Sequence, residues 1–433
     1  MRWAWFCMMI VACALPAHGE TDLRDLKAIV TAGQPSPLEL LAANAVQQQL
    51  SKMLGVKIPV TSTAPLEGRT IYVGRAATIS AGMIKANELD ALHSDGFVAR
   101  MGEGRVALAG RNDWGTVYAA YAWLEQLGYR YFAPDLQVAP QLKTTKIADV
   151  VLIEEPSFAF RRGVDWQLRG TTQEMIGDPR IPGKEAGVKL WIDHTAGLFV
   201  PRPKYLASHP EYYPLRRDGT RGVTRDSDGY VHLCLSNPQV IRITTEAALA
   251  WIEQQRERKY FFISQGDGHD WCQCDKCLAM DQAPGVYADR LLVWANHIAA
   301  AVKAKYPDKV LLALAYVGSD EPPLRERPAD NVMVLYCPYW GINLSMAHPL
   351  THEFNSQALA QFKGWQRVAG DQLGVYDYNL GYSPSWFAMA EKIKWYKTQG
   401  VRGIFLLGAP QPFNSDVQLH DGAAAVGRHA RST

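Results

Sequence analysis

Residues that could do chemistry gather in one short segment, Phe262–Cys277, whose sequence is FISQGDGHDWCQCDKC. Two acids, Asp267 and Asp270, with His269 between them, stand just before three cysteines that lie within the last six residues of the segment. Aspartate can act as a nucleophile, a base or an acid, whereas clustered cysteines can bind a metal, form a disulfide or do redox chemistry. The segment is therefore a metal site, a redox site or a braced loop that presents acids to a substrate.

Polar and aromatic side chains also stand where other apolar runs of the sequence end. Asp377 is a further candidate acid, because a carboxylate within so apolar a run is costly unless it is used. The candidate substrate-binding residues are aromatic or basic: His194, His269, Arg161, Tyr316, Trp340, Tyr376 and Tyr378. Aromatic rings stack on sugars, and arginine and histidine bind hydroxyl or carboxylate groups. These residue types predict a glycan-binding cleft with Asp267, Asp270 and Asp377 as its catalytic acids.

Several candidates also have a purely structural interpretation. The sequence Gly266-Asp267-Gly268 is typical of a turn, and His194, which follows Asp193, could be a core histidine bonded to the backbone. Asp320 stands in an acidic pair just before two prolines, which favours a charged loop.

The cysteines favour a structural role. The chain has seven, of which Cys7 and Cys13 lie near the N-terminus. Disulfides within the 272–277 loop or to Cys234 fit the spacing, and so does a zinc ion held by four thiolates. The residues assigned to this structural role are Cys234, Cys272, Cys274 and Cys277, with Cys337 as an alternative fourth zinc ligand. No thioredoxin-like or H-E-x-x-H pattern appears, so we expect no cofactor and no catalytic metal, and the choice between disulfide and zinc stays open.

The first residues resemble an export signal. Arg2 precedes an apolar run, and Ala17-His18-Gly19 has the small residues of a cleavage site, so residues 1–19 are predicted to be a signal peptide. Lipidation at Cys13 is a second-ranked alternative. We expect an exported protein, periplasmic or secreted, and no later segment is apolar enough to span a bilayer.

Composition narrows the partners. The 433 residues carry a formal net charge of +2, with 48% hydrophobic and 20% charged residues. This is an ordinary globular composition without a basic stripe, which argues against nucleic acid as a partner. The expected partner is a glycan or glycoprotein.

The elements that must position these residues form two regions. Residues 20–148 predict a small α/β domain, with helices at 37–54 and near 115–128 and a hairpin around Gly102-Glu103-Gly104. From residue 150, apolar strands alternate with helices; the expected strands are 158–166, 188–196, 259–267, 309–317, 331–340, 372–380 and 400–409. This alternation predicts a buried parallel sheet and a TIM-type (β/α) barrel over 150–433, whose catalytic groups lie at the C-terminal ends of its strands. A doubly wound open sheet is the alternative, but no G-x-G-x-x-G follows a strand.

The C-terminal tail does not have the pattern expected for the last strand and helix of a barrel. A full barrel needs eight strands, whereas residues 411–433 are rich in Ala, Gly, His and Arg and show no clear periodicity. The hypothesis is that the barrel is incomplete at its C-terminus and that the first and seventh strands are left as open edges.

The ordered motifs of the second region resemble a known family. They include SQGDGHDWCQCDKC, NVMVLYCP, LGVYDYNLGY and GVRGIFLLG, and they resemble the bacterial domain of unknown function 4838, part of which is classified as glycoside hydrolase family 163. Upstream, LLAANAVQQQLSKMLGVKIPV and GRNDWGTVYAAYAWLEQLGYRYFAP resemble the small domain that precedes the barrel in α-glucuronidases and β-hexosaminidases.

The resemblance implies a TIM barrel and, from characterised members, a retaining endo-β-N-acetylglucosaminidase acting on N-glycans. Asp267 and Asp270 match its acid loop, and Tyr376, Asp377 and Tyr378 match its sixth-strand motif. The sequence thus predicts an exported glycoside hydrolase that uses carboxylate acid/base catalysis. The alternative is a catalytically inactive glycan-binding protein on the same scaffold, which the unusual tail favours.

Overall fold

The computed structural model describes residues 20–65, 69–93, 95–133, 136–165, 193–223, 228–256, 258–339, 347–380 and 386–409. The predicted signal peptide, Cys13, Trp340 and the tail 411–433 lie outside these residues. The chain divides into two compact units, the first ending at Pro156 and the second beginning at Ser157. Within the described ranges, no helix is both long enough and apolar enough to cross a membrane.

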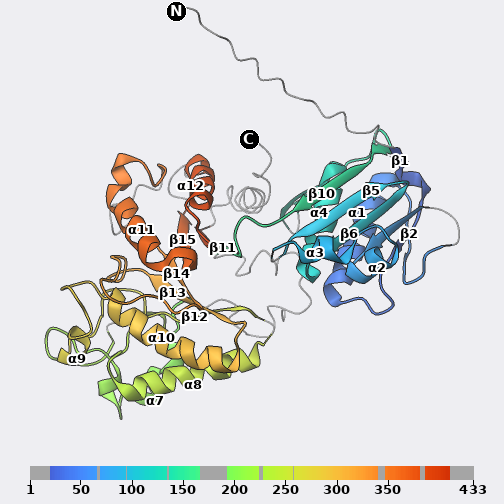
Figure 1. The fold of residues 1–433 in the computed structure, drawn as a ribbon. Coiled ribbons are helices and arrows are strands. Elements are labelled where there is room, and N and C mark those ends of the chain that lie inside the picture. Colours follow the sequence, from blue (N-terminus) through green and yellow to red (C-terminus); the bar gives the residue numbers. More distant parts are fainter. Residues whose placement is uncertain are drawn as a thin grey trace, which may run out of the picture. The chain divides into compact units, whose positions relative to one another are not determined.

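The first unit is built on a six-stranded mixed sheet of order β10-β5-β6-β4-β2-β3 (Figure 1). Its strands are β2 (Leu26–Val30), β3 (Val60–Thr61), β4 (Arg69–Val73), β5 (Phe97–Gly102), β6 (Arg105–Gly110) and β10 (Val150–Glu154). Its helices are α1 (Pro37–Leu54), α2 (Arg75–Ser80), α3 (Ala86–Asp90) and α4 (Asp113–Gln126). Two short pairs complete it: β1 (Glu20–Asp22) with β9 (Lys146–Ala148), and β7 (Arg130–Ala133) with β8 (Leu136–Val138).

Local sequence accounts for helix α1, whose predicted bounds are confirmed. Ser36 Oγ accepts a hydrogen bond from the Glu39 amide at 3.1 Å, and the Glu39 carboxylate accepts one from the Ser36 amide at 3.0 Å. This reciprocal pair satisfies two amides that have no partner inside the helix. Gly55 ends the helix at a φ of 72°, a left-handed conformation that costs glycine little.

Strand β10 extends the first unit beyond the predicted boundary. It pairs antiparallel with β5 from Val150↔Met101 to Glu154↔Phe97. The sequence prediction ended the small domain at residue 148 and began the barrel at 150. The structure instead places 150–154 in the first sheet, so the barrel-like sheet begins with the next strand.

The second unit contains a six-stranded, entirely parallel sheet of order β11-β16-β15-β14-β13-β12 (Figure 1). Its strands are β11 (Phe160–Asp165), β12 (Tyr260–Phe262), β13 (Val310–Ala315), β14 (Val332–Tyr336), β15 (Leu373–Leu380) and β16 (Gly403–Ala409). Its helices are α6 (Ala196–Phe199), α7 (Arg202–Tyr205), α8 (Pro238–Gln254), α9 (Asp275–Leu278), α10 (Ala288–Lys305), α11 (Ser356–Ala369) and α12 (Trp386–Thr398). The parallel arrangement confirms the prediction from apolar strands that alternate with helices.

The sheet curls, so that its two outermost strands approach each other at one end. The Phe160 ring of β11 lies 4.8 Å from the Tyr260 ring of β12, measured between centroids. The Tyr260 hydroxyl also donates to the Ala159 carbonyl at 3.2 Å. The described strands therefore form a partial barrel, and they do not establish the complete TIM barrel that was predicted.

Two predictions about the strands of the second unit differ from the structure. Of the predicted second strand, 188–192 lie outside the described residues, and 193–195 form no strand but lead into α6. The amides of Thr195 and Ala196 both donate to the Ser264 carbonyl, at 3.2 and 3.1 Å, so this segment lies beside the chain that leaves β12. The expected open edges between the first and seventh strands are wrong, because β11 pairs directly with β16 from Phe160↔Gly403 to Asp165↔Gly408.

Candidate functional site

The carboxyl end of the curled sheet brings together residues from distant parts of the chain. Tyr376, on β15, donates from its hydroxyl to Asp193 Oδ2 at 3.1 Å. His194 Nδ1 lies 2.7 Å from the Gln265 carbonyl, which stands just beyond β12. Side chains at the ends of parallel strands meet at one edge of the sheet, which is where barrel enzymes place their active sites. We take this edge as the candidate site.

Asp267 stands on a loop with a well-supported backbone. Its amide donates to the Gly229 carbonyl at 2.7 Å. The preceding residue, Gly266, lies so close to the backbone of the 230–231 segment that an added Cβ would sit 2.6 Å from the Val231 carbonyl oxygen. Glycine is required there by close packing, in addition to its fitness for a turn. The acid loop is thus held against the chain that precedes α8.

Trp271 anchors the other end of this loop. It is buried, and its indole nitrogen donates to the Val317 carbonyl at 2.8 Å. Its ring packs against Tyr287 with centroids 5.0 Å apart. Between the two anchors Asp267 and Asp270 are half-buried, whereas His269 is exposed. The predicted acid loop is therefore anchored at both ends, and Asp267, His269 and Asp270 all reach solvent.

A tyrosine lies beside each of two carboxylates. Tyr316 follows β13, and burial together with the charge of the nearby Asp267 raises the pKa of Tyr316 well above the ordinary tyrosine value. Tyr376 is almost fully buried, and burial followed by the charge of Asp193 raises the pKa of Tyr376 in the same direction. Both phenols remain protonated at neutral pH, and the Tyr376 hydroxyl holds Asp193 in place through its hydrogen bond.

The sequence places Asp193 at the end of the predicted second strand, but Asp193 is not one of the three predicted catalytic acids. Its only signal was its position beside His194 at the end of an apolar run. Its side chain is 18% exposed and that of His194 is 16% exposed, so both reach solvent. The His194 ring lies 6.0 Å from the Tyr316 ring between centroids, which links the Asp193 side of the site to the Asp267 side.

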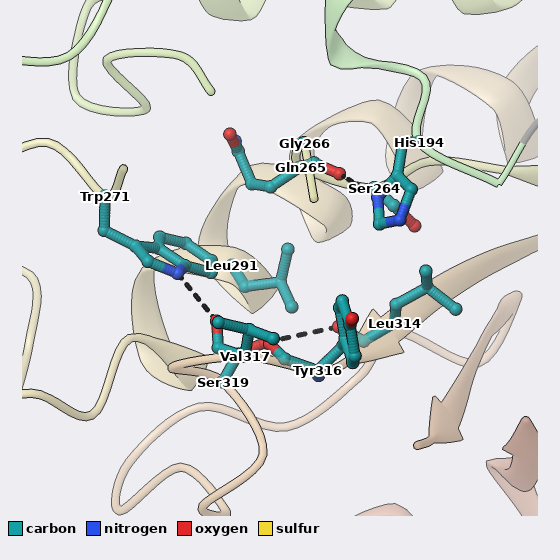
Figure 2. Close-up of a pocket in the computed structure, with 10 residues that line it drawn as sticks. All are labelled: His194, Ser264, Gln265, Gly266, Trp271, Leu291, Leu314, Tyr316, Val317 and Ser319. Carbon is teal, nitrogen blue, oxygen red and sulfur yellow. Dashed lines mark hydrogen bonds between the residues drawn. The ribbon is translucent and has the colours of Figure 1, made fainter. Parts of the chain in front are cut away.

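A small pocket opens between these groups (Figure 2). His194 and Tyr316 border one part of it, and Trp271 borders the other. Its remaining lining comes from Ser264, Gln265, Gly266, Leu291, Leu314, Val317 and Ser319. The pocket is small, with room for about one water molecule, so by itself it could form only part of a sugar subsite.

His232 is a second residue that the sequence analysis missed. It is buried, and its ring meets Trp271 edge-on with centroids 5.4 Å apart. Burial, and then the neighbouring His194, lower the pKa of His232 to about 3. His232 is therefore a neutral imidazole behind the acid loop at physiological pH.

Asp377 does not belong to the site, which corrects the sequence prediction. Its side chain is fully buried and forms an ion pair with Lys392 of α12 at 2.8 Å. Its other oxygen accepts from the Tyr396 hydroxyl at 2.6 Å. Because side chains alternate along a strand, Tyr376 points to the site while Asp377 points to the helix that covers the opposite face. The Asp377 carboxylate therefore has a structural role, which is to join strand β15 to helix α12.

The other predicted binding residues differ in outcome. Arg161 donates to the Phe158 carbonyl at 2.6 Å, which lies before the start of β11, so it turns away from the carboxyl end of the sheet. Tyr376 stacks on Phe405 with centroids 4.3 Å apart, and it is 2% exposed, so it positions Asp193 and offers no face to a sugar. Tyr378 is also buried. Tyr316 is half-buried, and it meets Tyr339 edge-on at 4.9 Å.

The cysteines cluster beside the acid loop. Cys234, Cys272, Cys274 and Cys277 are free thiols whose sulfurs all lie within 4.8 Å of one another. Cys337 stands apart on the chain after β14, where its thiol donates to the Leu335 carbonyl at 3.4 Å. The four clustered thiols are therefore the candidate metal ligands among the described residues.

Comparison with known proteins adds family information. A family model described as "Domain of unknown function (DUF4838)" matches residues 131–418, and one described as "Glycosyl hydrolase family 67 N-terminus" matches residues 14–123. No curated protein matches the chain. Among solved structures, one titled "Structure of CpGH84B" aligns at 12% identity with a TM-score of 0.40, covering 94% of this chain and 68% of that one.

Proposed function

This chain belongs to the family of the domain of unknown function DUF4838, and we propose that it hydrolyses O-glycosidic bonds in glycans. The match confirms the resemblance read from the motifs of the second unit. The match of residues 14–123 to a glycosyl hydrolase N-terminal domain supports the same class of reaction. The activity itself rests on the chemistry of the site.

The observation that carries the proposal is the pair of carboxylates, Asp193 and Asp267, at the carboxyl end of the parallel sheet. Asp193 accepts a hydrogen bond from the Tyr376 hydroxyl at 3.1 Å, and Asp267 lies close enough to Tyr316 for its charge to raise the pKa of that phenol. Hydrolysis of a glycoside uses two carboxyl groups, one to protonate the leaving oxygen and one to act at the other side of the sugar. Two positioned acids beside a pocket with aromatic walls fit that requirement.

In the proposed mechanism, Asp267 acts in its protonated form and gives its proton to the glycosidic oxygen as the bond from that oxygen to the anomeric carbon breaks. Asp193 is the second carboxylate, positioned by its hydrogen bond from Tyr376, and it acts at the opposite side of the sugar. In the narrower form of the proposal the substrate carries an N-acetyl group whose oxygen attacks the anomeric carbon, and Asp193 accepts a hydrogen bond from its N–H. Water then attacks the anomeric carbon as the bond from that carbon to the N-acetyl oxygen breaks. The water gives a proton to Asp267, and the sugar is released with retained configuration.

The narrower form, a retaining endo-β-N-acetylglucosaminidase, is supported by the family resemblance of the acid loop. Its test is digestion of an N-glycosylated protein and of aryl glycosides, with products identified by mass and the anomer of the first product by NMR. We expect a released glycan with retained configuration. Release of a different sugar would support the proposed hydrolase activity but would refute the narrower proposal of an endo-β-N-acetylglucosaminidase.

Two variants test the assignment of the acids. Asp267→Asn and Asp193→Asn should each lower kcat by about 10²- to 10⁴-fold, the range for loss of a general acid or base, with the thermal midpoint nearly unchanged. Asp330→Asn is the matched control, because that carboxylate is 70% exposed on the surface. Near-wild-type rates in both site variants would refute the assignment. Binding to a glycan array without release of any product would instead identify a glycan-binding protein.

We also propose export to the periplasm or the medium. The support is the sequence of residues 1–19, with Arg2, an apolar run and a small-residue cleavage pattern. N-terminal sequencing of protein recovered from the periplasm should begin at residue 20. A chain that remains in the cytoplasm with its first residues intact would refute this proposal.

A further inference from the structure

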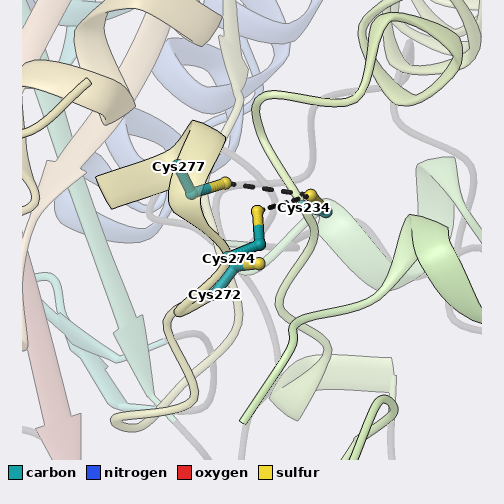
Figure 3. A group of neighbouring side chains, drawn as sticks. All are labelled: Cys234, Cys272, Cys274 and Cys277. Atoms are coloured by element: carbon teal, nitrogen blue, oxygen red, sulfur yellow. Dashed lines mark hydrogen bonds between the residues drawn. The ribbon is translucent and has the colours of Figure 1, made fainter. Parts of the chain in front are cut away.

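Four cysteine sulfurs converge on one point in the second unit (Figure 3). Cys272, Cys274 and Cys277 come from the segment that follows the acid loop, and Cys234 comes from the chain that precedes α8. The Cys234 sulfur lies 3.7 Å from that of Cys274 and 3.8 Å from that of Cys277. Cys234, Cys272 and Cys277 are buried and Cys274 is half-buried.

These separations distinguish a metal site from disulfides. Zinc binds thiolate sulfur at about 2.3 Å, so two ligands of a tetrahedral ion stand about 3.8 Å apart. A disulfide brings its two sulfurs to about 2 Å and would divide the four into two close pairs. The cluster has no such pairs. We propose that Cys234, Cys272, Cys274 and Cys277 together bind one zinc ion.

The surroundings suit a cluster of thiolates. The Leu215 amide donates to the Cys272 sulfur at 3.3 Å, as second-shell donors to metal-bound thiolates do. Arg221 donates to the Tyr213 carbonyl at 2.9 Å and lies close enough to interact electrostatically with Cys234. Arg290, almost fully buried, donates to the Cys272 carbonyl at 2.6 Å. Four thiolates around a divalent ion carry two net negative charges. Arg221 lies beside them with its positive charge, whereas the Arg290 guanidinium is paired with the buried Asp281 carboxylate and contributes its hydrogen bond to the loop backbone.

The ligand set indicates a structural ion. Four protein thiolates fill the tetrahedral shell, whereas a catalytic zinc keeps one position open for water or substrate. The zinc would fasten the segment after Trp271 to the chain that ends at Cys234. That chain is the one on which the acid loop packs through Gly266 and the Gly229 carbonyl. The ion would therefore hold both sides of the acid loop at its base.

This assignment is independent of the proposed hydrolase activity, because its test measures metal. The purified full-length protein, produced in zinc-supplemented medium, should contain one zinc per chain by mass spectrometry of the elements. Cys234→Ser and Cys277→Ser should lose most of that zinc and melt at lower temperature. Cys337→Ala is the matched control and should keep the zinc, because Cys337 lies outside the cluster.

Two measurements on the unaltered protein keep the test decisive where a serine variant does not fold. X-ray absorption at the zinc edge should show four sulfur neighbours at about 2.3 Å. Alkylation after unfolding in a chelator should modify all four clustered cysteines. A folded, metal-free protein in which these four resist alkylation until reduced would overturn the proposal in favour of two disulfides. Iron in place of zinc would overturn the choice of ion.

Discussion

Replacing Asp377 by asparagine should destabilise the protein while leaving the chemistry of the site intact. Asp377 and Lys392 are 0% and 1% exposed, and their charged atoms are 2.8 Å apart. The same carboxylate also accepts from the Tyr396 hydroxyl and from the Tyr378 amide, at 2.6 and 2.7 Å. Asparagine keeps the shape but removes the charge, so the Lys392 ammonium is left buried without a counter-ion.

The magnitude follows from that unpaired charge. Breaking a buried ion pair from one side costs about 3–5 kcal/mol, because the remaining charge has lost both water and partner. For a unit of this size that loss lowers Tm by roughly 10 °C. Removing both charges, in Asp377→Asn with Lys392→Met, should recover a large part of the loss, since no buried charge then remains unpaired.

The assay is urea unfolding followed by circular dichroism, with turnover measured on the folded fraction. Lys394→Met is the control, because Lys394 is 45% exposed in its pair with Glu391 and should change stability by less than about 1 kcal/mol. A variant Asp377→Asn with wild-type stability but abolished turnover would refute the structural role and restore Asp377 as a catalytic acid.

The remaining predictions concern the acid loop and the buried phenols. Gly266→Ala should lower both activity and stability, the latter by about 1–3 kcal/mol, because its Cβ would press on the Val231 backbone at 2.6 Å. Gly229→Ala, whose Cβ would meet open space, is its control, and equal behaviour of the two in unfolding and activity assays would contradict this reasoning. Burial raises the pKa of Tyr376, Tyr378 and Tyr396 well above the usual value near 10, so the unfolded chain loses protons that the folded one keeps. The free energy of unfolding should keep its full tyrosine contribution below about pH 10 and should fall as the pH rises above that value. The urea midpoint and the phenolate absorbance should therefore change together. Gradual ionisation of these tyrosines while the protein remains folded would refute the prediction.

The sequence predicted the elements that depend on local periodicity. Helix α1 and the β5–β6 hairpin appear where the pattern placed them, and so does the alternation of parallel strands with helices after residue 158, apart from the predicted strand at 188–196. Their causes are short-range, as in the capping of α1 by Ser36 and Gly55. The acid loop at 267–270 was also predicted, because turn residues and acids stand directly after an apolar strand.

Only the tertiary structure decided which of these residues meet. Alternation along β15 separates Asp377 from its neighbouring tyrosines, but the sequence does not say which face turns toward the site. Asp193 meets Tyr376 across 183 positions of the chain, and Cys234 meets Cys277 across 43. Such contacts depend on how strands are ordered in the sheet, and no local pattern carries that order. The sequence therefore determined which groups are available for chemistry, whereas long-range packing decided which of them act together and which serve the core.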